Sequence, residues 1–576
     1  MSRVSPQSYD GRTWLIMGLV VVMFLLLVAR VLSLQVLDLG RGTAFLKHQG
    51  DLRMVRTAEL PAYRGLITDR RGEPLAVSTP VVSLWANPAV LAQSERLDEL
   101  ARALDLSAGS LQERLDRYSQ RKFMYLERHL VPARAREILA LGIKGVRAER
   151  EYRRFYPAGE VAAQIVGMTN VDGKGVAGLE LAYDDWLSGR PGKKRYIKDL
   201  HGEAVRDIGV VEEAHPGRNL QLSIDLRLQY LQHRELARAV AVSGAEAGVI
   251  VTLDAHSGEI LASASHPDFN PNNRSEVAMG QTRNRAMTDT FEPGSTMKPL
   301  TLVAALESGR YTVDSIIDTS PGRIRVGRKV LHDPRDYGEI TVSRVIEKSS
   351  QVGVTMIAQD IGHEPVWDVF HRFGLGETTN TGFPGESGGL LPQRPKWRPI
   401  EEVTLAFGYG LTATPLQVAR AYAVFANGGL LPEVSILRRD AVDVGGRRVI
   451  DARIAEDVRR VLQAVTGENG TAGRARIAGY EVGGKTGTVH KVGAGGYLDD
   501  QYVALFAGIA PIDDPRVVTV VVLDRPKGDS YGGGSAAAPV FARVASETLR
   551  LLGVVPTLAP VDEAEELLAA APGGAL

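Results

Sequence analysis

The residues most able to do chemistry are Ser295 and Lys298, three positions apart in the segment Phe291-Glu292-Pro293-Gly294-Ser295-Thr296-Met297-Lys298-Pro299. The spacing predicts that both lie on one face of a helix that starts at Thr296 and ends near Ser308. On that face a neutral Lys298 could accept the hydroxyl proton of Ser295, while the helix N-terminus favours the developing negative charge. The pair predicts a serine nucleophile with a lysine as its general base.

Two further short elements follow in the order found in serine acyl-transferases. Ser349-Ser350-Gln351 is expected in a loop, and Lys485-Thr486-Gly487-Thr488 is expected on a strand at the edge of a cleft. On such a strand, the ammonium group and the hydroxyls can hold a substrate carboxylate. Each element alone is a weak signal, but the three in this order predict an acyl-transferase with a serine nucleophile.

The elements that must position these residues predict an α+β domain. Residues 220–224 indicate a strand, and Asp225 is a suitable N-cap for the helix after it. Residues 247–253 and 260–265 indicate a hairpin of two buried strands, and residues 517–523 indicate another core strand. Because strands stand at both ends of a helix-rich stretch, we expect a sheet closed by segments far apart in the sequence.

Residues 35–219 are rich in charge and concentrate no chemistry. We expect a strand over residues 81–85, a helix over residues 91–104, and amphipathic helices over residues 111–141, interrupted at Pro132. Solvated helix faces explain the last pattern, and a surface that docks a partner is the alternative. Two glycine- and proline-punctuated segments are expected to be turns between strands, residues 64–72 and 154–159.

An apolar stretch near the N-terminus covers residues 14–34, interrupted by Arg30. Its length is about the ~20 residues that cross a bilayer, and a long arginine side chain near one end can reach the interface. No small-residue cleavage site follows, so we expect an uncleaved membrane anchor rather than a signal peptide. Arg3 and Arg12 favour a cytoplasmic N-terminus, although cations that follow the span weaken this signal.

Composition excludes some function classes. The 68 Lys and Arg residues balance 68 Asp and Glu residues, so no global positive field would hold a nucleic acid. Without cysteine there is no disulfide or Cys-ligated metal, and lone residues such as His332 and His490 are not expected to be metal ligands. A chain of 576 residues is also too long for one core, so at least two domains are expected.

Together these elements resemble the class B penicillin-binding proteins, and they are most similar to the septal, cell-division branch called penicillin-binding protein 3. The resemblance covers nearly the whole chain. Besides the three elements above, it rests on Arg64-Gly65 with Asp69-Arg70 and Gly72, residues 154–159, Gly178-Leu179-Glu180 with Tyr183, Asp254 with Gly258-Glu259, Asn270-Pro271-Asn272, Phe407-Gly408-Tyr409-Gly410, Thr414-Pro415-Leu416-Gln417, and Tyr531-Gly532-Gly533 with Ala538-Pro539-Val540-Phe541.

The resemblance implies an α+β multidomain protein with one transmembrane helix, an elongated non-catalytic pedestal for dimerisation or partner contacts, and a transpeptidase domain whose antiparallel sheet is flanked by helices. The low-complexity C-terminus is expected to be disordered. The expected boundaries are a cytoplasmic tail at residues 1–13, the transmembrane helix at 14–34, the periplasmic pedestal at 35–219, the transpeptidase domain at 220–556 and the disordered tail at 557–576.

The family mechanism implies that Ser295 attacks the penultimate D-Ala carbonyl of a pentapeptide stem, with Lys298 as general base. Ser349 would relay the proton to the leaving D-Ala, and an amine of a second stem would then attack the acyl-enzyme. The backbone N–H groups of Ser295 and Thr488 would form the oxyanion hole. The residues implied to bind the substrate are Gln351, Lys485, Thr486, Gly487 and Thr488, and no metal or other cofactor is expected.

One residue departs from the family pattern, because the second element is usually Ser-x-Asn and Gln351 stands in the Asn position. Glutamine keeps the amide donor and acceptor on a side chain that is one methylene longer. The departure puts in doubt how the amide backbone of the substrate is held, but it leaves the nucleophile untouched.

The resemblance also implies partners and a location. The expected partners are stem peptides of lipid-linked precursor glycan strands, β-lactam antibiotics, a membrane glycosyltransferase and divisome proteins. The expected location is the bacterial inner membrane, crossed once, with the C-terminal domains in the periplasm. The alternatives are an elongation-type class B transpeptidase, a D,D-carboxypeptidase or β-lactamase on the same fold, and a β-lactam sensor, against which the single span and short N-terminal tail argue.

Overall fold

The structure is a computed structural model, and it describes residues 11–35, 45, 48, 55–198, 204–278, 280–440, 445–493, 496–528 and 531–558. Most of the predicted cytoplasmic tail and of the predicted disordered tail lies outside the described residues. The chain forms two compact units, one made of Met1–Tyr63 with Gly189–Pro216 and the other of Arg64–Ser188 with Gly217–Leu576. The domain boundary expected at residue 219 stays a prediction.

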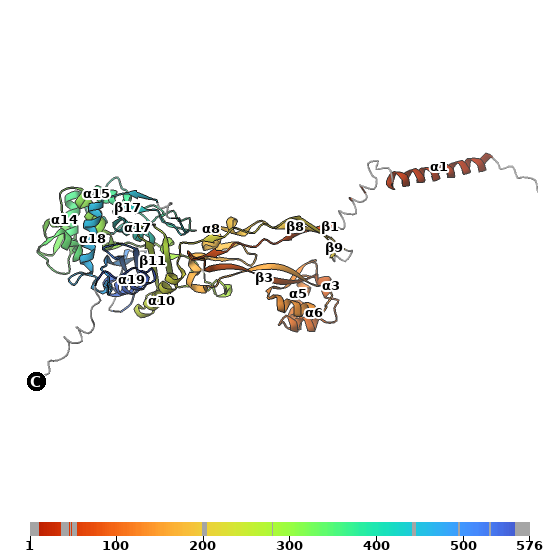
Figure 1. The fold of residues 1–576 in the computed structure, drawn as a ribbon, viewed down its shortest axis with the longest axis horizontal. Helices are drawn as coiled ribbons and strands as arrows, with labels where there is room; N and C mark the ends of the chain where they lie inside the picture. The colour runs from red at the N-terminus through yellow and green to blue at the C-terminus, as the bar shows by residue number, and fades with distance from the viewer. Residues whose placement is uncertain are drawn as a thin grey trace, which may run out of the picture. The chain divides into compact units, whose positions relative to one another are not determined.

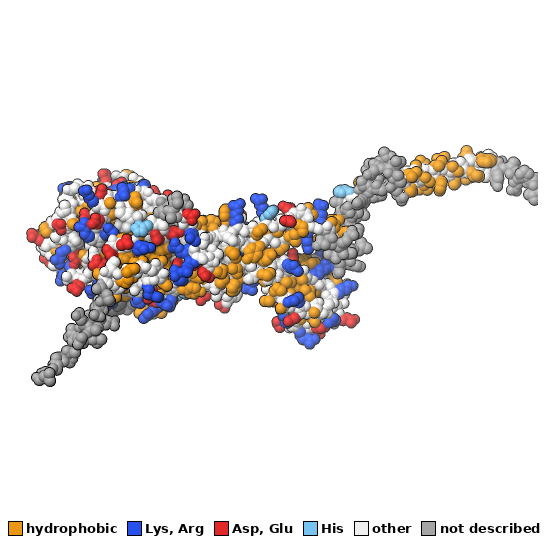
Figure 2. Space-filling view, in the orientation of Figure 1, with side chains coloured by type: hydrophobic (Ala, Val, Ile, Leu, Met, Phe, Trp, Pro, Cys, Tyr) orange, Lys and Arg blue, Asp and Glu red, His pale blue; other side chains and the backbone are white. Residues whose placement is uncertain are grey.

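The first unit contains a long apolar helix and a small sheet. Helix α1 (Gly11–Gln35) is long and apolar enough to cross a membrane, with a mean hydropathy of 2.9 over its span and no burial, as the sequence predicts. Figure 2 shows hydrophobic side chains over its visible face. The sheet is antiparallel and three-stranded, in the order β1 (Val55–Leu60), β8 (Gly192–Lys198) and β9 (Ala204–Glu212).

A five-stranded antiparallel sheet organises the C-terminal part of the second unit. Its order is β12 (Ile260–His266), β11 (Ala247–Asp254), β21 (Val517–Asp524), β20 (Gly496–Ala510) and β19 (Gly483–Gly493). The predicted hairpin, β11 with β12, and the predicted C-terminal strand β21 are therefore confirmed. Strand β11 also pairs with β21, although the two strands lie far apart in the sequence. Strand β19, which carries the Lys-Thr-Gly element, lies at the edge.

Helices cover both faces of this sheet. On one side of β11, α10 (Leu226–Ser243) packs against α19 (Ala538–Leu551), and α17 (Pro415–Ala426) lies on the other (Figure 1). Asp225 caps α10 through its side chain, as predicted. The predicted strand over residues 220–224 is shorter, because β10 (Leu220–Gln221) pairs with β2 (Ile67–Thr68) and Leu222 forms only an isolated bridge with Leu437 before the Asp225 cap.

Further helices surround α12 (Lys298–Glu307), which begins with the predicted site residue Lys298 and contacts α13, α14, α15 and α18. These and the remaining helices of this part are α11 (Arg285–Thr288), α13 (Val342–Glu347), α14 (Gln351–Ile361), α15 (His363–Arg372), α16 (Pro399–Leu405) and α18 (Ala452–Thr466). Short strand pairs complete it, namely β13 (Ile316–Asp318) with β16 (Glu339–Thr341), β14 (Arg323–Val326) with β15 (Lys329–His332), and β17 (Leu430–Pro432) with β18 (Gly446–Arg448).

Residues 64–188 of the second unit contain long strands and a small helical lobe with its own core. Strand β3 (Pro74–Ala86) pairs with β4 (Met124–Leu130) and with β5 (Val146–Phe155), which confirms the strand predicted over residues 81–85. Figure 1 shows the lobe beside one end of β3. Its helices are α3 (Pro88–Leu91), α4 (Leu97–Ala103), α5 (Ala108–Arg117) and α6 (Pro132–Ala140).

Two helix predictions in this lobe are wrong in part. The helix expected over residues 91–104 is broken into α3 and α4. The helices expected over residues 111–141 are interrupted by strand β4, in which Met124 and Leu126 are buried and alternate with more exposed neighbours. That alternation has a period of two, which suits a strand that pairs with β3 and not a helix.

A buried ion cluster joins segments that are far apart in the sequence. Arg64 Nε and Arg154 Nε donate to the two carboxylate oxygens of Glu180 at 2.7 and 2.5 Å, and Glu180 is fully buried. Arg64 also donates to Asp184 at 2.7 Å. The two segments expected only as turns therefore carry the cations of this cluster. The remaining elements near it are η1 (Gly159–Ala162), α7 (Ala163–Val166), β6 (Met168–Thr169), β7 (Gly175–Ala177), α8 (Gly178–Ala182) and α9 (Asp184–Ser188).

Candidate active site

The proposed nucleophile Ser295 lies in a short 3₁₀ turn, η3 (Gly294–Met297), and α12 begins only at Lys298. The prediction that the helix starts at Thr296 is therefore wrong, because Pro299 occupies the first turn of α12 and the residues before it wind more tightly. In a 3₁₀ turn, side chains three residues apart are eclipsed. Ser295, which is partly exposed, and the buried Lys298 thus keep the shared face that the spacing predicted.

Close packing holds the nucleophile turn against strand β19. Gly294 has a φ of +55°, and a Cβ atom there would lie 2.4 Å from Val489 Cγ2, so only glycine fits. Gly408 has a φ of +83° and accepts a hydrogen bond from Gly294 N at 3.0 Å. The buried Tyr422 donates its hydroxyl to Thr296 O at 2.8 Å. Tyr422 was not recognised from the sequence, because its role depends on a contact between α17 and a turn 126 residues away.

Ser349 lies in a tight connection between two helices. It follows α13 with a φ of +57°, a left-handed conformation that is unfavourable for a residue with a side chain. Ser350 then caps α14, its hydroxyl accepting from Gly353 N at 2.8 Å. Lys348 is the C-cap of α13, so Ser349 alone separates the caps of the two helices. Its carbonyl and its hydroxyl both accept from Lys298, the first residue of α12.

Two buried lysines meet at Ser349. Lys298 Nζ donates to Ser349 O at 2.6 Å and to Ser349 Oγ at 3.2 Å, and Lys485 Nζ donates to Ser349 Oγ at 2.9 Å. Burial lowers the pKa of Lys298 to about 7, an effect that the Asp333 carboxylate partly opposes. Burial, followed by the charge of Lys298, also lowers the pKa of Lys485 well below its ordinary value. A neutral lysine amine is therefore accessible near pH 7.

Asp333 is a site residue that the sequence did not reveal. Its carboxylate accepts hydrogen bonds from Ser350 Oγ and from the backbone N–H groups of Gln351 and Val352, the latter at 3.1 Å. A carboxylate at a helix N-terminus is stabilised by the unpaired N–H groups there. Asp333 thus fixes the start of α14 and the connection that carries Ser349. Its position after β15, in sequence next to His332, gives no motif that could have identified it.

The remaining predicted residues belong to the edge strand β19 and to the start of α14. Lys485, Thr486, Gly487 and Thr488 all belong to β19, as predicted. Thr488 is exposed, and its Oγ1 accepts from Gly533 N at 2.9 Å. Gln351 is the first residue of α14 and is partly exposed. Four of the five predicted substrate-binding residues therefore belong to β19, and the fifth, Gln351, begins the helix that follows Ser349 by two residues.

This arrangement suits acyl transfer through a serine. A partly exposed hydroxyl stands one 3₁₀ turn before a buried lysine, and a second hydroxyl bridges that lysine to another. Both Ser295 and Lys298 are described, and no hydrogen bond joins their side chains, so the lysine amine must turn from Ser349 toward Ser295 before it can take the proton. Within the part of the chain that the structure describes, no cluster of three or more His, Cys, Asp or Glu residues could hold a metal ion.

Two family models match the chain. The model of the penicillin binding protein transpeptidase domain matches residues 248–546, and the model of the penicillin-binding protein dimerisation domain matches residues 59–222. The chain therefore belongs to the penicillin-binding proteins of class B, as the sequence motifs indicated.

Curated relatives cover nearly the whole chain. A probable peptidoglycan D,D-transpeptidase, PbpC of Pseudomonas aeruginosa, is 41% identical over 96% of this chain and 97% of its own length. The peptidoglycan D,D-transpeptidase FtsI of Escherichia coli K12 is 40% identical over 94% of this chain and 92% of its own length. Among solved structures, penicillin-binding protein 3 of Mycobacterium tuberculosis, complexed with aztreonam, has a TM-score of 0.68 and 29% identity, covering 88% of this chain and 100% of that chain.

Proposed function

We propose that this protein is a peptidoglycan D,D-transpeptidase that uses Ser295 as its nucleophile. One observation carries the proposal: the Ser349 hydroxyl accepts hydrogen bonds from the buried Lys298 and Lys485. Lys298 follows the proposed nucleophile by three residues. The full-length likeness to proteins named D,D-transpeptidases, at about 40% identity, supports the same reaction.

In the first half-reaction, Ser295 Oγ attacks the penultimate D-Ala carbonyl carbon of a donor stem, and its proton passes to the neutral amine of Lys298. The backbone N–H groups of Ser295 and Thr488 stabilise the oxyanion. The C–N bond to the terminal D-Ala then breaks, and the proton travels through the Ser349 hydroxyl to the leaving amine. The product is an ester between the donor stem and Ser295.

In the second half-reaction, an uncharged amine of an acceptor stem attacks the ester carbonyl. A new amide C–N bond forms, the C–O bond to Ser295 breaks, and the amine proton returns to Ser295 Oγ through Lys298. Lys485, Thr486 and Thr488 hold the terminal carboxylate of the donor before it leaves, and Gln351 contacts its amide backbone. β-Lactams acylate the same serine because their carbonyl and carboxylate resemble the D-Ala-D-Ala end.

The wider role follows from the other elements of the chain. Helix α1 suits a single membrane anchor, and we propose that the residues after it are periplasmic, where peptidoglycan stems are found. We propose residues 35–219 as the pedestal and 220–556 as the transpeptidase domain, acting in septal wall synthesis with a membrane glycosyltransferase and divisome proteins. An elongation role is the second candidate, and the septal one is supported by the matches over residues 407–417 and 531–541.

The direct test is cross-linking by the full-length protein in detergent. Lipid-linked precursor bearing pentapeptide stems is polymerised by a glycosyltransferase that has no transpeptidase activity, and the product is digested and analysed by mass spectrometry. The proposal expects cross-linked stems and one released D-Ala for each cross-link. Release of D-Ala with uncross-linked tetrapeptides only would identify a D,D-carboxypeptidase instead.

A further inference from the structure

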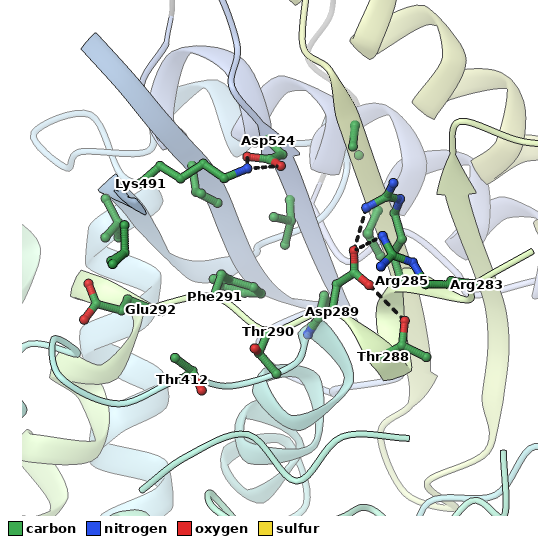
Figure 3. A pocket seen from close by; sticks show the side chains of 18 of the residues that line it. Arg283, Arg285, Thr288, Asp289, Thr290, Phe291, Glu292, Thr412, Lys491 and Asp524 are labelled. Atoms are coloured by element: carbon green, nitrogen blue, oxygen red, sulfur yellow. Dashed lines mark hydrogen bonds and ion pairs between the residues drawn. The ribbon is translucent and has the colours of Figure 1, made fainter. Parts of the chain in front are cut away.

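A charged pocket lies beside the nucleophile turn and takes no part in the chemistry described above. It has a volume of about 520 Å³. Val249, Val503 and Val522 of the sheet line it. Residues of the segment from Arg283 to Glu292 also line it, and Figure 3 labels them. Because this segment leads directly into the turn that carries Ser295, the pocket and the nucleophile share one piece of backbone.

The pocket also meets the site through strand β19. Val489 packs against Gly294 of the nucleophile turn and also lines the pocket. Lys491, two residues further along the strand, lines the pocket as well. Two residues of strand span about 7 Å. A ligand that contacts Val489 in the pocket would therefore lie next to the residue that packs against the nucleophile turn.

The two ends of the pocket carry opposite charge. At one end, Arg283 Nη2 lies 3.4 Å from Asp289 Oδ2 and Arg285 Nη1 lies 2.5 Å from the same oxygen, so two guanidinium groups share one carboxylate. Lys491 and Asp524 neutralise each other at 2.5 Å. Glu292 stands at the opposite end of the view in Figure 3, away from both arginines. The arginine end has one excess positive charge, and the Glu292 end has one negative charge.

Glu292 itself lacks a complete set of partners. Its Oε1 accepts from Gly410 N at 2.8 Å and from Tyr497 OH at 3.2 Å, whereas Oε2 is buried and has no partner among the described residues. A buried carboxylate oxygen without a donor is costly, and a ligand ammonium group would supply one. Burial raises the pKa of Glu292, and the hydrogen bonds from Gly410 N and Tyr497 OH oppose this effect.

Resting on the proposed transpeptidase function, we propose that this pocket is the subsite for the acceptor stem peptide. The acceptor must present an amine to the acyl-enzyme, and as a peptide it also carries a carboxylate. Its ammonium group pairs with Glu292, three residues before Ser295, and its carboxylate pairs with Arg283 and Arg285. This direction places the attacking amine at the end nearest the ester. The ammonium group gives one proton to Glu292 or solvent before it attacks.

The test separates acylation from aminolysis in the full-length protein in detergent. A thioester analogue of the donor stem acylates Ser295 and releases a thiol, which measures acylation without an acceptor. Two acceptor tripeptides share a free side-chain amine, and one ends in a carboxylate while the other ends in an amide. Mass spectrometry gives the ratio of aminolysis product to hydrolysis product for each acceptor.

We expect wild-type protein to prefer the carboxylate acceptor roughly tenfold, the worth of one hydrogen bond between charged groups. The double variant Arg283→Gln and Arg285→Gln should lose this preference, whereas Arg453→Gln, an exposed arginine on α18, should keep it. Glu292→Gln should lower aminolysis with both acceptors and leave their ratio unchanged. If the double variant folds poorly, the single Arg283→Gln variant is used, because that side chain is half exposed.

Equal use of the two acceptors by wild-type protein, or an unchanged preference in the arginine variants, would overturn the acceptor subsite while leaving the transpeptidase function intact. Absence of thiol release and of an acyl group on Ser295 would instead contradict the proposed function itself. The two failures are therefore distinguishable within one experiment.

Discussion

Lys298 and Lys485 donate to the same acceptor, the Ser349 hydroxyl, at 3.2 and 2.9 Å. Both amines are buried, and burial lowers the pKa of each. Two ammonium groups that share one neutral acceptor repel each other, so the pair favours a state with fewer than two protons. This arrangement makes a neutral lysine available near neutral pH, as the proposed general-base role of Lys298 requires.

The pH dependence of acylation should show the protonation of this lysine pair. The neutral amine of Lys298 is the reactive form, so the second-order rate of acylation by benzylpenicillin should rise with pH and level off above about 7, the pKa of Lys298. Below that value the rate should fall roughly tenfold for each pH unit. Stopped-flow measurement between pH 5 and 9 checks this. A rate that is flat across this range would contradict a titrating lysine base.

Asp333→Asn should move that profile to lower pH. The Asp333 carboxylate raises the pKa of Lys298, so its neutralisation should lower the midpoint of the profile. The plateau should also fall, because an amide cannot accept all the hydrogen bonds that hold the start of α14. Asp314→Asn, an exposed carboxylate elsewhere in the domain, is the control. An unchanged midpoint in Asp333→Asn would show that Asp333 does not act on Lys298.

Gln351→Asn should change which β-lactams react fastest. The backbone of Gln351 is fixed by its hydrogen bond to Asp333, so the extra methylene moves the side-chain amide by about 1.5 Å, and misplacement of that order can cost ~10²-fold in rate. Acylation rates of both proteins are compared across several penicillins and cephalosporins. A changed ranking of the drugs supports a selective role, and identical rates for every compound show that Gln fully replaces Asn.

Glu180→Gln should destabilise the second unit. Glu180 is fully buried between Arg64 and Arg154, and removal of its charge leaves two buried cations without a full partner. Breaking such a cluster costs about 3–5 kcal/mol of unfolding free energy. Thermal unfolding in detergent should show a large drop in Tm for Glu180→Gln and almost none for the exposed Asp185→Asn. Similar Tm values for the two variants would show that the ion cluster does not stabilise the second unit.

The sequence was most informative where local patterns and the fold agree. Residues 247–253 and 517–523 are uninterrupted runs rich in β-branched side chains, which only a buried strand explains well, and both became core strands. The Ser-x-x-Lys, Ser-Ser-Gln and Lys-Thr-Gly elements also predicted residues that the structure brings together at Ser349. In each case the information lies within a few consecutive residues.

The sequence failed where tertiary contacts decide. Strand β4 forms because β3 is available to pair with it, although its residues lie in a stretch with helical spacing. Asp333 and Tyr422 act on segments that only the fold brings near them, so neither stood out. The 3₁₀ turn around Ser295 likewise depends on packing against Val489 and Gly408, which a helix-start rule does not contain.

The central claim is that Ser295 is the nucleophile, and covalent labelling tests it most directly. Full-length wild-type protein is treated with a fluorescent penicillin, digested and mapped by mass spectrometry, together with Ser295→Ala and with Ser275→Ala, an exposed serine outside the site. We expect the adduct on the peptide containing Ser295, full labelling of Ser275→Ala, and no labelling of a folded Ser295→Ala protein. Labelling that survives in Ser295→Ala, or an adduct on another residue, would contradict the account.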